Sequence, residues 1–402
     1  MKISENWLRT WVNPAVDSNT LSDQLTMLGL EVDDLSPAAK PFTGVVVGEV
    51  LTVEQHPDAD RLRVTTVNIG SGEPLQIVCG APNVRVGMKA PVATIGAVLP
   101  GDFKIKKGKL RGIESQGMLC GASEIDLEDK IDGLLELAVD APVGVDIREY
   151  LQLDDHVIDI SITPNRGDCF SIRGIAREIG VINQLTVTAP EINAVAATIA
   201  DEKKVVVSTE GCPRYLGRVI KNVNTKAATP EWMERALVRS GIRQHSILVD
   251  ITNYVLMELG QPLHAFDAAK IQGSVQVRQA NTAEKLVLLN EQEVELNEKV
   301  MVIADDEKAL AIAGIMGGLS SSVTDETQDI FLESAFFAPL AIAGRARSFG
   351  LHTDASQRYE RGVDFELPML AMHRASQLIA ELAGGEFGPI TIAEQAAVLP
   401  KR

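Results

Sequence analysis

Cysteine is scarce in this sequence. The 402 residues contain four, widely spaced along the chain, namely Cys79, Cys120, Cys169 and Cys212. None belongs to a C-x-x-C pair, and none has a histidine at metal-ligand spacing, which argues against a zinc site and a disulfide framework. The pattern is typical of reduced thiols, and we expect no metal site in this chain.

Long apolar runs are also missing. The longest, Ala309 to Leu319, is far shorter than the ~20 residues that a membrane-spanning helix needs. It is rich in glycine and small residues, which predicts a buried strand followed by a turn. The first residues, MKISENWLRTWVN, lack the apolar core of a signal peptide. We therefore expect a cytoplasmic protein without a membrane partner.

A surplus of positive charge is absent as well. The chain has 38 Lys and Arg against 55 Asp and Glu, a net charge of −17. Binding of nucleic acid through bulk charge needs clustered cations, so this mode is excluded, and we expect no DNA partner. A local basic patch on an acidic body stays possible. With 45% hydrophobic and 23% charged residues the composition is globular, and the length predicts two or three domains.

Several catalytic motifs fail on inspection. Residues 101–109 resemble a phosphate-binding loop, but the glycines are too far apart and Leu110 stands where a Ser or Thr is required. Residues 314–318 lack the glycine spacing and the βαβ context of a dinucleotide site. No serine lies in a G-x-S-x-G turn, and the six histidines form no H-E-x-x-H.

The chain begins with two regions that differ in their pattern of apolar residues. Residues 1–40 contain a helix with leucines on one face, and residues 42–150 are short apolar runs separated by Gly and Pro. The second pattern predicts a small closed β-barrel of the OB type. Residues 151–190 then return to a strand and an isoleucine-rich helix. We predict that the barrel is inserted into a small αβ domain formed by residues 1–40 and 151–190.

The third region, residues 205–400, follows a linker over 184–204 and has a mixed α+β pattern. Its predicted helices start at Thr229, at Asp250 or Thr252, near Ala338 and at Thr353, and a long one covers 367–383. Gly241 and Gly260 are expected to end the first two of these helices. Strand-like runs fill the space between them. The predicted fold class is therefore a multidomain α+β protein.

A basic run lies on a predicted hairpin of the barrel. Its members are Lys104, Lys106, Lys107, Lys109 and Arg111. OB-type barrels use such cations to follow a phosphate backbone, and the alternative is an ordinary solvated hairpin. The barrel region as a whole carries more acidic than basic residues, which weakens the first interpretation.

Three segments of the barrel region carry a family resemblance. HPDADRL at 56–62, QIVCGA at 76–81 and SQGMLC at 115–120 occur in the order of the EMAP-type tRNA-binding domain, and the region closely resembles it. An EMAP-type barrel near the N-terminus followed by an α+β domain resembles the bacterial-type beta subunit of phenylalanyl-tRNA synthetase. Further agreeing blocks lie at 159–168, 212–215, 249–254, 260–267, 314–318, 332–337 and 351–362.

The resemblance implies a parent complex of two alpha and two beta subunits that ligates phenylalanine to tRNA(Phe) with ATP and Mg²⁺. The family's beta chain is much longer, so the resemblance implies an N-terminal half. Activation of phenylalanine belongs to the alpha subunit in this family. We therefore expect this half to need no cofactor and not to aminoacylate alone.

In the family, the third region hydrolyses mischarged Tyr-tRNA(Phe), which is an editing reaction. A phenylalanine pocket rejects an added hydroxyl only by about 10²-fold, whereas a site that binds the hydroxyl discriminates far better. The resemblance implies the following residues: His264 and Thr353 for catalysis, and Glu333, Ala355, Gly314, Gly317, Thr252 and Asn253 for the editing pocket.

Each of these residues has an ordinary alternative. A lone glutamate is usually solvated or salt-bridged, a lone histidine is usually structural, and Thr353 is a normal helix N-cap candidate. The rival function is a scaffold and tRNA-binding fragment that is inactive without the alpha subunit and the C-terminal half. Spacing alone does not choose between these possibilities.

Overall fold

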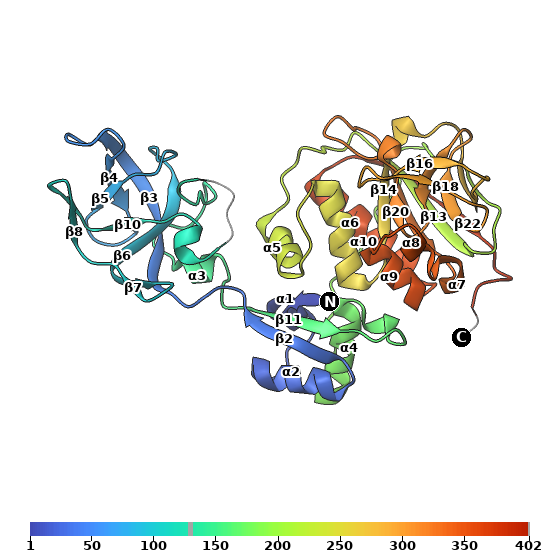
Figure 1. Cartoon of the computed structure of the whole chain (residues 1–402), viewed down its shortest axis with the longest axis horizontal. Coiled ribbons are helices and arrows are strands. Elements are labelled where there is room, and N and C mark those ends of the chain that lie inside the picture. Colours follow the sequence, from blue (N-terminus) through green and yellow to red (C-terminus); the bar gives the residue numbers. More distant parts are fainter. Residues whose placement is uncertain (128–131, 401–402) are drawn as a thin grey trace. The chain divides into compact units, whose positions relative to one another are not determined.

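The computed structural model describes residues 1–127 and 132–400, which form two compact units (Figure 1). One unit combines Met1–Leu35 with Val157–Arg402, and the other is Ser36–His156. Residues 128–131, which fall inside the predicted barrel range, and residues 401–402 lie outside the described part. The second unit is thus inserted into the sequence of the first.

The inserted unit is built on an antiparallel sheet with the strand order β10-β6-β3-β4-β5, with β7 pairing with β6. Its elements are β3 (Thr43–Gln55), β4 (Arg63–Asn68), β5 (Leu75–Cys79), β6 (Lys89–Leu99), β7 (Phe103–Lys104), β10 (Gly117–Leu119), the separate hairpin of β8 (Gly108–Leu110) and β9 (Ile113–Ser115), η1 (Ser123–Ile125) and α3 (Ile147–Tyr150). The alternation of buried and half-buried residues along β4 is typical of a strand with one face in the core. Among the described residues the strand pairing does not join into a ring, so the closed barrel stays a prediction.

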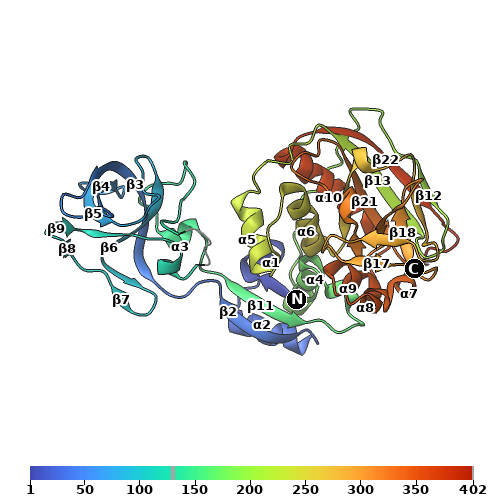
Figure 2. The same ribbon diagram turned by 45° about the horizontal axis from the view of Figure 1, so that its top comes forward.

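The larger unit contains a small αβ part made from both flanks of the insertion. A three-stranded sheet has the order β1-β11-β2, and helices accompany it. The elements are β1 (Lys2–Ser4), α1 (Glu5–Trp11), α2 (Ser18–Met27), β2 (Glu31–Pro37), β11 (His156–Ser161), η2 (Gly167–Cys169) and α4 (Ile172–Asn183). Ser4 and Ser171 cap α1 and α4 by accepting backbone N–H bonds. Figure 2 shows α1 and α4 close to the strands of this sheet.

The rest of the larger unit has three layers: helices, a four-stranded sheet and a five-stranded sheet. The four-stranded sheet is β14 (Leu263–Asp267), β21 (Ile330–Phe336), β13 (Arg214–Lys221) and β22 (Glu386–Glu394). The five-stranded sheet is β12 (Val205–Val207), β15 (Val275–Gln279), β18 (Met301–Ala304), β19 (Ala309–Ile312) and β20 (Met316–Gly317). A hairpin of β16 (Lys285–Val287) and β17 (Glu293–Glu295) and the short η3 (Ala268–Lys270) and η4 (Leu319–Ser321) complete the β part.

Side chains that alternate along β13 and β21 pack on opposite faces of the four-stranded sheet. Leu332 on β21 and Leu216 on β13 belong to the core shared with the helices, whereas Phe331 and Ala335 belong to the core between the two sheets. Because neighbouring side chains on a strand point to opposite faces, Glu333 shares the inter-sheet face with Phe331 and Ala335. The Glu333 side chain therefore lies between the two sheets.

The helices are α5 (Glu231–Arg239), α6 (Ile247–Leu259), α7 (Pro339–Ile342), α8 (Arg345–Ser348), α9 (Asp354–Arg361) and α10 (Leu367–Leu382). Gly260 ends α6 with φ 87°, and Thr353 caps α9, both as predicted. The predicted caps at Thr229, Asp250 and Thr252 are wrong. Thr229 instead donates a hydrogen bond of 2.6 Å to Asp250, which also accepts the His245 N–H, while Ser246 is the N-cap residue of α6. A tertiary contact thus takes the place of local capping.

The state of the cysteines and the length of the helices can be compared with the sequence-based expectations. All four cysteines are free and buried. No helix within residues 1–127 and 132–400 is long and apolar enough to cross a membrane.

Candidate functional site

Paired strands bring His264 and Glu333 together. β14 and β21 pair antiparallel with His264 directly opposite Glu333, and Gly217 on β13 lies opposite Glu333 on its other side. All three positions share the inter-sheet face. Gly217 leaves room for the Phe331 ring, because a Cβ atom there would lie 2.1 Å from the ring.

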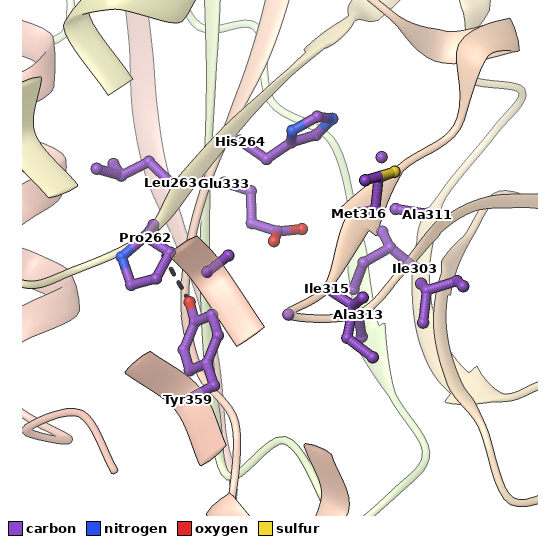
Figure 3. A pocket seen from close by; sticks show the side chains of 14 residues that line it. Pro262, Leu263, His264, Ile303, Ala311, Ala313, Ile315, Met316, Glu333 and Tyr359 are labelled. Carbon is purple, nitrogen blue, oxygen red and sulfur yellow. Dashed lines mark hydrogen bonds between the residues drawn. The ribbon is translucent and has the colours of Figure 1, made fainter. Parts of the chain in front are cut away.

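A cavity with about 400 Å³ of empty space, part of it open to solvent, lies at this point. Its walls come from the two sheets, the loop between β19 and β20, and α9. The lining residues are Pro262, Leu263, His264, Ile303, Ala311, Ile312, Ala313, Gly314, Ile315, Met316, Gly317, Glu333, Ala355 and Tyr359. The lining is mostly apolar, with a few polar side chains among the apolar ones. Figure 3 shows the Glu333 carboxylate pointing into this space, with His264 and Tyr359 nearby.

Glu333 is the one carboxylate among the lining residues. It is buried, and its Oε2 accepts a 2.6 Å hydrogen bond from the Tyr215 hydroxyl. Burial raises the pKa of Glu333 to about 7, while the Tyr215 hydrogen bond acts in the opposite direction. A carboxylate has more acceptor sites than this single bond uses, so its other oxygen is available to a molecule in the cavity.

His264 presents a neutral ring to the same cavity. Burial lowers its pKa to about 4. Its Nε2 is buried and has no hydrogen-bond partner among the described residues. The ring packs edge-on against Phe266, with the ring centroids 4.4 Å apart. A Cβ atom on Gly317 would lie 2.5 Å from His264 Cε1, so the glycine leaves the space that the imidazole occupies.

The loop after β19 depends on a second glycine. Gly314 has φ +68°, and a Cβ atom there would lie 2.9 Å from Phe337 and 3.0 Å from Tyr359. The Thr353 hydroxyl donates a 2.9 Å hydrogen bond to the Ile315 carbonyl and accepts the Ser356 N–H. Thr353 therefore ties the start of α9 to this loop, and its hydroxyl is already engaged on both sides.

The structure brings together only part of the predicted set. His264, Glu333, Gly314, Gly317 and Ala355 line the cavity, whereas Thr353 lies behind it. Thr252 and Asn253 lie on α6 and are not among the lining residues, and the Thr252 hydroxyl donates to the Val249 carbonyl at 2.8 Å.

Sequence reasoning missed Tyr215 as a functional residue. The available signal was strand parity, since Tyr215 and Gly217 are two residues apart on β13 and therefore share a face. Tyr359, which donates to the carbonyls of Pro262 and Ala335, was missed as well.

Replacing Glu333 with glutamine should stabilise the chain at alkaline pH. A carboxyl whose pKa is raised by folding contributes full stability below its unfolded pKa and loses it as pH rises through the folded pKa, which is about 7 here. We expect Glu333→Gln to gain on the order of 2–3 kcal/mol at pH 8 and almost nothing at pH 4.5, because 1 pKa unit is 1.4 kcal/mol. Urea unfolding at both pH values measures this.

The exposed Glu326→Gln is the matched control and should show no pH-dependent gain. His264 changes the free energy of unfolding with pH in the opposite direction. Wild type and Glu333→Gln both contain His264, so its contribution cancels when the two are compared. If Glu333→Gln changed the free energy of unfolding equally at the two pH values, the raised pKa of Glu333 would be wrong.

The basic run of the inserted unit lies around β7 and β8. All five cations are exposed, but Lys107 pairs with Glu114 at 3.0 Å and Arg111 donates to the Asp58 carbonyl at 3.1 Å. Lys104 and Lys106 line a cleft that is open to solvent. In the HPDADRL segment, His56 is buried and contacts the Leu110 carbonyl and the Asp58 N–H, both at 3.1 Å. This histidine therefore supports the hairpin.

One group of potential cation ligands occurs among the described residues, namely Asp168, Cys169 and Glu178. Arg166 already pairs with Asp168 at 3.2 Å and with Glu178 at 3.0 Å. A guanidinium therefore neutralises this cluster, and we assign it a structural role.

Comparison with known proteins agrees with this architecture. A family described as "Putative tRNA binding domain" matches residues 45–146, and a family described as "B3/4 domain" matches residues 211–384. The phenylalanine–tRNA ligase beta subunit of Acinetobacter baylyi is 81% identical over 402 residues, which is all of this chain and 51% of the relative. The chain belongs to the phenylalanine–tRNA ligase beta-subunit family. It spans about half the length of the curated relatives it matches.

A second curated relative matches in the same way. The subunit of Psychrobacter arcticus is 64% identical over 409 aligned residues, again 100% of this chain and 51% of the relative. A solved N-terminal fragment of the phenylalanyl-tRNA synthetase beta subunit from Pyrococcus horikoshii is 15% identical with a TM-score of 0.33 and covers 58% of this chain and 63% of that one. The cavity lies within the B3/4 match, between residues 262 and 359.

Proposed function

We propose that the B3/4 region of this chain hydrolyses the ester of tyrosine mischarged onto tRNA(Phe). The observation that carries the proposal is the Glu333 carboxylate, which is buried in a mostly apolar cavity with one oxygen held by Tyr215. An apolar cavity suits an aromatic ring, and the remaining carboxylate oxygen suits a phenolic O–H. Ala355, Gly314 and Gly317 have small or no side chains and leave space in the cavity for such a ring.

Selectivity follows from the cost of leaving Glu333 unpaired. Tyrosine would donate its hydroxyl to the free carboxylate oxygen, whereas phenylalanine would cover that oxygen and provide no hydrogen bond. A site that binds a hydroxyl can reject the analogue lacking it by about 10⁴-fold. The correct product, Phe-tRNA(Phe), is thereby spared.

The hydrolysis needs only a positioned water, because an aminoacyl ester is already activated. The free Nε2 of the neutral His264 accepts a hydrogen bond from the water and orients it. The water oxygen bonds to the ester carbonyl carbon, the bond to the ribose oxygen breaks, and the neighbouring ribose hydroxyl assists transfer of the proton to the departing oxygen. Thr353 contributes by holding the loop at Ile315.

Deacylation assays test this function. The chain should release tyrosine from Tyr-tRNA(Phe) much faster than phenylalanine from Phe-tRNA(Phe). If it releases neither, even at high concentration and after addition of the alpha subunit and the remainder of the beta subunit, the scaffold alternative is correct. The wider setting, an assembly of two alpha and two beta subunits that uses ATP and Mg²⁺ in the cytoplasm, is part of the same proposal.

We further propose that the inserted unit is an OB-type barrel that contacts tRNA. Gln116 N–H donates to the Gln76 carbonyl at 2.8 Å, which connects β5 with the segment before β10 and supports closure of the sheet. The domain division that accompanies this proposal is 1–40 with 151–190, 42–150, and 205–400. Lys104, Lys106 and Lys109 are exposed and form no ion pair among the described residues, so they are candidates for phosphate contacts.

Reversing both charges, Lys106→Glu with Lys109→Glu, should weaken tRNA binding by about 10-fold or more and reduce the slope of log K against log salt by about 2. Filter binding at several salt concentrations measures both quantities. Lys226→Glu, an exposed lysine of the larger unit, is the control. Unchanged affinity and slope in the double variant would remove the RNA contact from this hairpin.

A further inference from the structure

Tyr215 is fully buried on β13 and donates its hydroxyl to Glu333 Oε2 at 2.6 Å. It does not line the cavity, so a ligand there does not reach it. The bond crosses from β13 to β21, next to the register pair of Gly217 and Glu333.

The other titratable groups facing Glu333 do not replace this bond. His264 on β14 is neutral, because burial lowers its pKa to about 4. Burial raises the pKa of Cys212, which precedes β13, and of Tyr359 on α9, so both stay protonated and neutral. No cation faces the carboxylate within residues 1–127 and 132–400. Tyr215 therefore provides the stabilising hydrogen bond for the ionised form.

We propose that Tyr215 is a positioning residue that fixes the Glu333 carboxylate in one orientation and favours its ionised form, so that its second oxygen accepts the phenol of the substrate. This inference rests on the proposed function and adds a determinant of its specificity. A carboxylate held on one oxygen offers the other in a defined direction. A protonated Glu333 would instead be a weaker acceptor and would tolerate phenylalanine better, because a neutral group costs less to leave unpaired than a charged one.

The proposal is tested first by binding, which does not depend on hydrolysis. Wild-type chain should prefer L-tyrosinamide to L-phenylalaninamide at pH 8 and lose this preference as pH falls through about 7. In Tyr215→Phe we expect the transition to move up by about one pH unit, so that the preference at pH 7.5 falls several-fold and recovers near pH 9. Carbon-13 NMR of labelled glutamate carboxyls, assigned with Glu333→Gln, should show the same shift in midpoint.

Tyr254→Phe is a matched control, because it removes another buried phenol that lies beside a carboxylate, Glu258, away from the cavity. Its pH profile should equal that of the wild type. An unchanged profile in Tyr215→Phe, or an equal change in Tyr254→Phe, would overturn the proposal. Absence of deacylation in a chain that still shows the binding shift would contradict the proposed reaction and leave the Tyr215 assignment supported.

Discussion

Glu333→Ala should deacylate Tyr-tRNA(Phe) with a kcat/KM about 10²-fold below the wild type, while its activity on Phe-tRNA(Phe) stays equal or rises. The loss corresponds to a hydrogen bond between the substrate phenol and a charged acceptor, which is worth about 1.5–3 kcal/mol. Deacylation of Phe-tRNA(Phe) does not slow, because the variant lacks the buried carboxylate that a phenylalanine ring would leave without a hydrogen bond. Single-turnover deacylation of both substrates measures the ratio.

Two comparisons make this result specific. Glu326→Ala removes an exposed glutamate and should keep both rates. Unfolding curves at pH 8 should show that Glu333→Ala is folded, since the lost side chain is an ionised group in an apolar setting. If both substrates slowed equally, Glu333 would be required for the reaction itself and not for recognition of the phenol, and the proposed specificity would be wrong.

Much of the fold could be predicted because its signals are local. The left-handed Gly260 at the end of α6, the Thr353 cap of α9 and the length of α10 all depend on residues within a few positions of each other. The apolar stretch from Ala309 contains a buried strand and a turn, as its composition indicated. Such patterns need no knowledge of the tertiary structure.

The remaining features depend on contacts between distant residues. Thr229 bonds Asp250 across 21 positions, and Tyr215 bonds Glu333 across 118 positions. Sequence spacing therefore misassigned the first pair as helix caps and did not detect the second. The family resemblance named Glu333 and His264, but it also named Thr252, which the structure places on α6 outside the cavity lining. Strand parity accounts for Glu333 and His264, which face each other on paired strands and share the inter-sheet face, whereas Thr252 lies on a helix.

The largest expected loss of stability involves the helix layer behind this sheet. Glu258 on α6 and Arg374 on α10 form a two-bond ion pair, with Nε to Oε2 at 2.8 Å and Nη2 to Oε1 at 3.0 Å. Both side chains are buried. Arg374→Ala leaves an uncompensated carboxylate inside the protein, and we expect it to lower the free energy of unfolding by about 3–5 kcal/mol. At about 2–4 °C per kcal/mol the melting temperature should fall by roughly 10 °C, measurable by calorimetry.

The cause of this loss is an unpaired charge, so removing both partners should restore stability. The double variant Glu258→Leu with Arg374→Met replaces the pair with apolar side chains and should recover most of the lost free energy. Lys226→Ala breaks an exposed pair with Glu326 and should leave the melting temperature unchanged. A double variant as unstable as Arg374→Ala would show that the loss comes from packing of the arginine stem between α6 and α10. In that case the ion pair would not be the source of the effect.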